Sequence, residues 1–141
     1  IYEMRDLPPP DPAVGDDPNY HLGLVYADGT RKLAFSTVQL LVALLNTDSL
    51  IVADGEPEIK VRSRRTRELY RHLFVRPDGR QVLIMWDRDA SPMLDVKLPR
   101  GGSRATSYWL DGSGAPLDMR GGTVRGIRLR PGEVSIAVTD P

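Results

Sequence analysis

The sequence predicts an α+β chain in which one strand and one helix are followed by an antiparallel β-sandwich. Three observations indicate this. Residues 1–6 read as the end of a buried strand, residues 31–45 carry apolar side chains at helical spacing, and the apolar period changes to two beyond residue 55. This order of strand, long loop and helix looks like the last βα unit of a larger barrel.

The segment between the predicted strand and helix, residues 7–20, contains five prolines. Each proline lacks an N–H donor and restricts the residue before it, so this segment cannot be helical. Two interpretations stay open. The segment is either a linker or a rim loop over an active site, since long loops in compact domains are often lids or binding loops.

A turn at Asp28-Gly29 precedes the predicted helix, which runs from Arg31 to Leu45. Apolar residues recur along one stripe at i, i+4, i+7 and i+11, namely at Ala34, Val38, Leu41 and Leu45. The second half of the helix is apolar nearly all round. We therefore expect it to pack between two layers.

Beyond the helix, short runs of alternating apolar and polar residues are separated by Gly/Pro turns. Pro77-Asp78-Gly79-Arg80 is one of these turns and predicts a hairpin. The predicted strands cover residues 69–75, 81–86, 92–98, 104–110, 122–129 and 133–138. This spacing is typical of an antiparallel sandwich, so we divide the chain into residues 1–50 and a β-sandwich of residues 51–141.

Composition excludes several functions. The 19 basic and 19 acidic residues cancel, so we expect no nucleic-acid partner. With no Cys and only two distant histidines, we expect no metal and no cofactor. The longest apolar run, residues 40–45, is too short to span a membrane. Localisation stays unknown. The excess of Arg over Lys is associated with bacterial genes, and we lean toward a secreted or periplasmic protein.

The first 45 residues resemble the end of a clan A glycoside hydrolase, an enzyme built on a (β/α)8 barrel. The resemblance rests on four motifs in order: Tyr2-Glu3-Met4-Arg5-Asp6, Gly23-Leu24, Asp28-Gly29-Thr30 and Lys32-Leu33-Ala34. Leu33 stands where the pattern usually has Pro. A looser similarity to the accessory sandwiches of these enzymes covers Phe74 to Gly79, the strand ending in Trp86, and Asp111 to Gly114.

The resemblance implies that residues 1–50 are the last strand, rim loop and last helix of such a barrel. Active sites of these barrels lie at the C-terminal ends of the strands. The catalytic pair of a retaining enzyme is two carboxylates about 5–5.5 Å apart. In this clan they come from the fourth and seventh strands, which would precede residue 1. We therefore expect no catalytic residue in this chain, and the chain alone to be inactive.

Tyr2, Glu3, Arg5 and Asp6 are the candidate substrate-binding residues, because they would sit at the barrel rim. Tyr2 would replace the stacking Trp that the clan usually has on its eighth strand. Glu3 and Arg5 would bind sugar hydroxyls or orient the nucleophile. The alternative is that Glu3, Arg5 and Asp6 form a structural network. As a catalytic acid, Glu3 does not fit the clan's geometry.

In the sandwich, the aromatic residues best suited to stack on a sugar are Trp86, Tyr108 and Trp109. Trp86 ends an apolar strand and is expected in the core. Tyr108 and Trp109 are neighbours on one predicted strand, so they must face opposite sides, one buried and the other exposed.

Two functions follow as hypotheses. In the first, the chain is the C-terminal portion of a retaining glycoside hydrolase that acts on a poly- or oligosaccharide. Its partners are then the remainder of the barrel, on the same protein or a separate chain, and the carbohydrate. In the second, the chain is a non-catalytic β-sandwich module that binds glycan or protein. A stand-alone hydrolase is disfavoured, because no nucleophile–base motif is present.

Overall fold

A computed structural model of the chain describes residues 4–6, 23–47, 51–52, 55–63, 66 and 68–141. The chain divides into two compact units. The N-terminal unit comprises residues 1–43 with 110–112, and the β unit comprises residues 44–109 and 113–141.

The chain contains one helix, α1 (Leu33–Leu45), in the part that the structure describes. It is two residues shorter at its start than the sequence predicts. Leu40 is the buried residue of α1, whereas Leu33 and Val42 are 57% and 52% exposed. The prediction that this helix is buried between two layers is therefore wrong.

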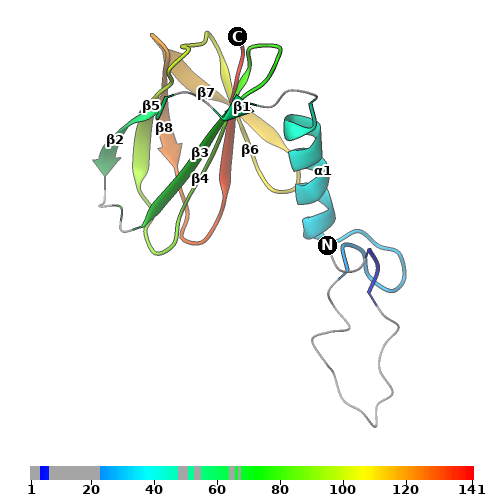
Figure 1. Cartoon of the computed structure of the whole chain (residues 1–141). Coiled ribbons are helices and arrows are strands. Elements are labelled where there is room, and N and C mark those ends of the chain that lie inside the picture. Colours follow the sequence, from blue (N-terminus) through cyan, green and yellow to red (C-terminus); the bar gives the residue numbers. More distant parts are fainter. Residues whose placement is uncertain (1–3, 7–22, 48–50, 53–54, 64–65, 67) are drawn as a thin grey trace. The chain divides into compact units, whose positions relative to one another are not determined.

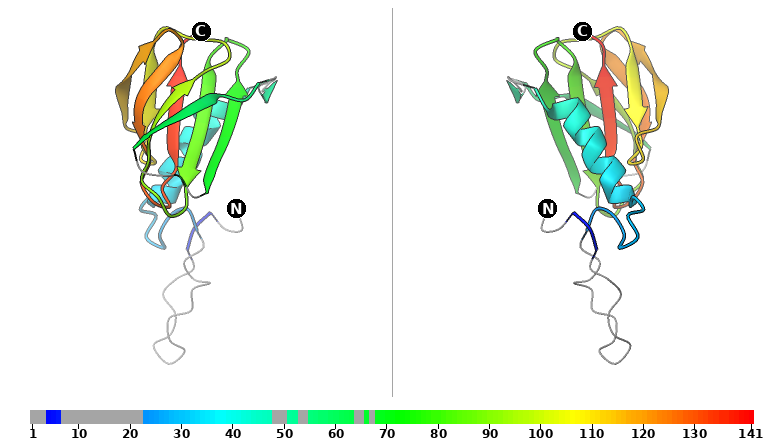
Figure 2. Two further views of the ribbon diagram at one scale, coloured as in Figure 1. Left: turned by 90° about the vertical axis from the view of Figure 1, so that its left-hand side faces the viewer. Right: turned by 90° about the vertical axis from the view of Figure 1, so that its right-hand side faces the viewer.

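The strands of the β unit form one continuous sheet in the order β1-β3-β4-β9-β6-β7-β8-β5-β2. Every pairing is antiparallel. The strands are β1 (Ile51–Val52), β2 (Glu58–Ser63), β3 (Leu69–Val75), β4 (Gln81–Asp87), β5 (Met93–Lys97), β6 (Ala105–Tyr108), β7 (Gly114–Arg120), β8 (Thr123–Arg128) and β9 (Ser135–Thr139). Figures 1 and 2 show how they curl into a half-barrel.

The predicted hairpin of β3 and β4 is present, with Leu73 opposite Leu83 and Val75 opposite Gln81. Its turn closes through the Gly79 amide, which donates to the Arg76 carbonyl at 2.9 Å. Gly79 has φ +84°, a left-handed conformation that costs glycine little.

β7, which the sequence analysis did not predict, makes the two halves of the sheet continuous. Its first part, from Gly114 to Leu117, pairs with β6, and its last part, from Asp118 to Arg120, pairs with β8. Pro116 lies in the part that pairs with β6 alone, an edge-like position where a missing N–H donor is tolerated.

Side chains from both halves of the curled sheet fill its interior. β4 contributes Leu83 and Met85, and β5 contributes Leu94 and Val96, all at most 1% exposed. Other members of this core are Leu73, Leu98, Ala105, Val124, Ile127, Leu129 and Ala137. The core is contributed mainly by side chains spaced two apart on each strand, as the alternating pattern predicts.

The prediction of a (β/α)8 barrel end followed by a sandwich was wrong. Before α1 the described residues form only isolated bridges, Arg5 with Val25 and Val25 with Arg31. The predicted strands 69–138 are largely present, but they belong to one curled antiparallel sheet and not to two stacked sheets. The similarity to the glycoside hydrolase clan therefore does not extend to its fold.

Candidate functional site

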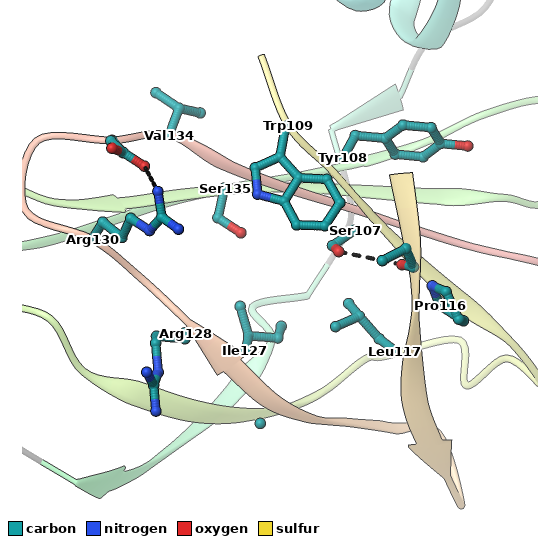
Figure 3. Close-up of a pocket in the computed structure, with 13 residues that line it drawn as sticks. Ser107, Tyr108, Trp109, Pro116, Leu117, Ile127, Arg128, Arg130, Val134 and Ser135 are labelled. Carbon is teal, nitrogen blue, oxygen red and sulfur yellow. Dashed lines mark hydrogen bonds and ion pairs between the residues drawn. The ribbon is translucent and has the colours of Figure 1, made fainter. Parts of the chain in front are cut away.

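A groove of about 280 Å³ opens at one end of the half-barrel, where β6, β7 and β8 meet the segment that leads into β9 (Figure 3). Its apolar floor includes Ile127 and Leu117. Its polar lining includes the hydroxyl side chains of Ser107 and Ser135, and charged groups stand at the rim. The volume is close to the lower end of the range of about 300–1,000 Å³ for small-ligand sites.

Trp109 forms one wall of this groove and is 47% exposed. It follows β6 directly, and its amide donates to the Ser113 carbonyl at 2.9 Å. That bond closes the connection to β7 and fixes the backbone from which the indole projects. Figure 3 shows the indole over the groove, with Ile127 and Leu117 drawn across from it.

Tyr108 precedes Trp109 and is the more buried of the two. It lies opposite Gly114 on β7 and Ile136 on β9. A Cβ on Gly114 would approach the Tyr108 ring to 3.2 Å, so the ring packs over the space that glycine leaves. The prediction of one exposed and one buried aromatic is confirmed for the exposed Trp109, whereas Tyr108 is only half-buried and also lines the groove.

Charged side chains at the rim come from the end of β8 and the turn that follows. Arg128 and Arg130 are exposed, and the Nη1 atom of Arg130 lies 3.5 Å from Oε2 of Glu133. Together, the groove offers an aromatic face, an apolar floor, hydroxyl groups and charged hydrogen-bonding groups.

A second aromatic cluster lies on β3 and β4. The rings of Tyr70 and Trp86, which are directly opposite in the sheet, stack with centroids 5.0 Å apart. His72 lies 5.5 Å from the Trp86 ring, tilted by 31°. Trp86, expected in the core, is only half-buried, because it faces away from the apolar interior that its neighbour Met85 enters.

The residues predicted to bind substrate belong to the N-terminal unit and are not among those that line this groove. Tyr2 and Glu3 lie outside the described residues. Arg5 donates from Nε to the Ala27 carbonyl at 2.8 Å. Asp6 is 6% exposed and accepts from the Gly23 amide at 3.0 Å and from Lys32 Nζ at 2.6 Å.

These contacts join three of the four motifs on which the resemblance rested. The remaining motif is Asp28-Gly29-Thr30. In it, the Asp28 carboxylate accepts from the Thr30 amide at 2.8 Å, and this hydrogen bond lowers the pKa of Asp28. The motif residues that the structure describes therefore stabilise the local backbone of the N-terminal unit. Their role in binding a substrate stays a prediction.

The sequence analysis missed Arg128, Arg130 and Glu133 as site residues, because Arg130-Pro131-Gly132-Glu133 reads as a turn. The sequence did contain a signal for the two arginines. Arg128 and Arg130 flank the apolar Leu129, and residues two apart on an extended segment face the same side, so this spacing predicts a charged side. Asp87, the last residue of β4, stabilises the turn that follows, because its carboxylate accepts from the amides of Asp89 and Ala90.

No group of three acidic or histidine side chains suited to a metal ion occurs among the described residues. α1 has 13 residues and is too short to cross a membrane, and no helix among the described residues is long and apolar enough to do so. Compared with known proteins, the chain matches no family profile and no curated protein.

Proposed function

We propose that the β unit is a non-catalytic module that binds a saccharide in the groove beside Trp109. The observation that carries this proposal is the half-exposed indole set against an apolar floor and a polar rim. An indole presents a flat apolar face with a polar N–H edge. Such a face suits the C–H side of a sugar ring, while hydroxyl, carboxylate and guanidinium groups suit the sugar hydroxyls.

The dimensions of the groove favour a saccharide over the alternative ligand, a protein. A stable protein interface covers about 800 Å² on each partner. The groove holds about 280 Å³ and is lined by side chains from several strands, so it fits one or two rings better than a broad surface.

The wider hypothesis, that the chain is the C-terminal portion of a retaining glycoside hydrolase, stays a prediction. That hypothesis required the chain to complete a (β/α)8 barrel, and the fold does not support this requirement. The proposal for the groove does not depend on it, because a binding module needs only its own site.

Isothermal titration calorimetry of the full chain with cellohexaose, xylohexaose, maltohexaose and oligogalacturonate tests the proposal. Trp109→Ala removes the indole and is expected to weaken binding of the best ligand about tenfold or more, as loss of a central aromatic contact does. Trp86→Phe is the matched control, because Trp86 stacks on Tyr70 and does not line the groove. The control is expected to bind as the wild type does.

Two results would overturn the proposal. One is that none of the four saccharides binds. The other is that a saccharide binds equally well to the wild type and to Trp109→Ala, since this would place the binding site elsewhere.

A further inference from the structure

We infer that the groove selects an acidic saccharide, whose carboxylate binds the guanidinium group of Arg128 at the rim. This inference rests on the proposed function and adds the chemical class of the ligand. It is carried by the backbone that presents Arg128, by the charges around the groove and by the position of Arg128 relative to Trp109.

The backbone around Arg128 is held firmly. Leu129, the next residue, is 1% exposed and belongs to the core. The Leu129 amide donates to the Pro92 carbonyl at 3.0 Å, and the Leu129 carbonyl accepts from the Ser91 hydroxyl at 2.8 Å. Because alternate residues of an extended segment face opposite sides, Arg128 and Arg130 both project away from the core.

A bulge in β8 determines that Arg128 is the residue on this side. Val124 and Ile127 are three positions apart, yet both are buried, because the register against β5 shifts between them. Gly126 supplies the bulge with φ +69°, and its amide donates to the Asp95 carboxylate at 3.0 Å. The bulge keeps Ile127 in the floor and Arg128 at the rim.

The charges around the groove favour an anion. Two arginines and one glutamate line it, although the whole chain is neutral. Glu133 pairs with Arg130 at 3.5 Å. In the part of the chain that the structure describes, no acidic side chain lies within ion-pair distance of Arg128. Arg128 therefore offers a planar set of donors that matches a carboxylate.

The lining also explains why the anion would be part of a sugar. Arg128 and Trp109 line the same groove, and Ile127, which belongs to its apolar floor, directly precedes Arg128 in the chain. A ring that stacks on the indole can extend a carboxylate toward this rim. A small inorganic anion would use the arginine and leave the indole and the floor uncovered.

The test compares oligogalacturonate with its methyl ester, which has the same length and hydroxyl groups but no charge. We expect the wild type to bind the acid about fivefold more tightly, the effect of one exposed ion pair. Arg128→Gln should abolish the difference by weakening the acid alone. Added salt should have the same effect.

Arg125→Gln is the matched control, because Arg125 lies on the same strand, is exposed and does not line the groove. It removes the same charge and should keep the fivefold preference. Thermal unfolding of both variants checks that each is folded.

The outcomes separate the two proposals. Equal affinity of the wild type for acid and ester would overturn the acidic preference and leave saccharide binding intact. A preference that Arg125→Gln loses as fully as Arg128→Gln would also overturn it, since bulk charge would then be the cause. If neither the acid, the ester nor a neutral hexasaccharide binds, the proposed function fails as well.

Discussion

The two units of this chain are stabilised in different ways. The β unit has an interior of apolar side chains contributed by strands that are far apart in sequence, with Leu83, Met85 and Leu94 at most 1% exposed. In the described part of the N-terminal unit, Leu24 and Leu40 are the buried apolar residues, and the Asp6–Lys32 ion pair lies among backbone hydrogen bonds. One unit depends on apolar burial, and the other on a small set of polar contacts and close backbone packing.

This difference explains why a sequence motif was a poor guide to the fold. The motifs that resemble a barrel end lie in the N-terminal unit, where short polar patterns arrange a few residues locally. Such an arrangement can occur in many architectures. The alternating apolar pattern of the β unit reflects a whole core, so it predicted most strands correctly.

The largest effect is expected in the β unit. Leu83→Ala creates a cavity in the core and should lower the free energy of unfolding by about 2–5 kcal/mol. Val61→Ala is the control in the same unit, since Val61 is 42% exposed, and it should cost less than about 1 kcal/mol. Chemical denaturation followed by circular dichroism measures both. Similar costs for the two variants would show that the interior is not the main source of stability.

The next effect concerns close packing in the N-terminal unit. A Cβ on Gly23 would lie 2.4 Å from the Arg5 carbonyl carbon and 2.4 Å from the Asp6 amide nitrogen. These backbone atoms can move only if the local structure opens, so Gly23→Ala should cost about 1–3 kcal/mol. Hydrogen exchange should then show lost protection at the amides of Asp6 and Lys32, with the core amides of the β unit unchanged.

Gly29→Ala is the matched control for this substitution. Gly29 has φ +90°, but no atom lies within 4 Å of the position that the alanine methyl group would take, so only backbone strain of about 1 kcal/mol is expected. If Gly23→Ala exposed the amides of the β unit as well, the two units would not differ in the way described.

The smallest effect concerns a polar contact at the surface of the β unit. Tyr70 donates to Oε1 of Glu68 at 2.6 Å, and this hydrogen bond raises the pKa of Tyr70 above 10.0. The neutral phenol is therefore favoured in the folded state. Its contribution to stability is present below pH 10 and is lost as the pH rises through the raised pKa.

Glu68→Gln should lower the pKa of Tyr70 toward 10. Ultraviolet titration of the phenolate measures it, as the difference between each protein and its Tyr70→Phe counterpart. An unchanged pKa would show that another group causes the shift.

Features that are determined by residues close together in sequence were predictable, and features that depend on residues far apart in sequence were not. The hairpin of β3 and β4 was predictable because its alternation and turn lie within about 20 residues. β7 was missed because Asp111-Gly112-Ser113-Gly114 reads as a turn, and because the pairing of β7 with both β6 and β8 depends on the curl of the whole sheet. That curl turned two expected sheets into one.

The groove was predictable only in part, for the same reason. The neighbouring positions of Tyr108 and Trp109 were enough to predict one exposed aromatic. The arginines of the rim lie about 20 residues further along the chain and join Trp109 only through the order of the strands. No local pattern connects these residues, so their proximity depends on the fold.

The most direct measurement of the central claim is the NMR signal of the indole N–H group of Trp109 during titration with oligogalacturonate. The chain has two tryptophans, so Trp86 supplies an internal reference within the same unit. The account predicts that the Trp109 indole signal and the backbone signals of Arg128 and Ser135 shift in a saturable manner while the Trp86 signal stays in place. A saturable shift of Trp86 with no change at Trp109 would contradict it.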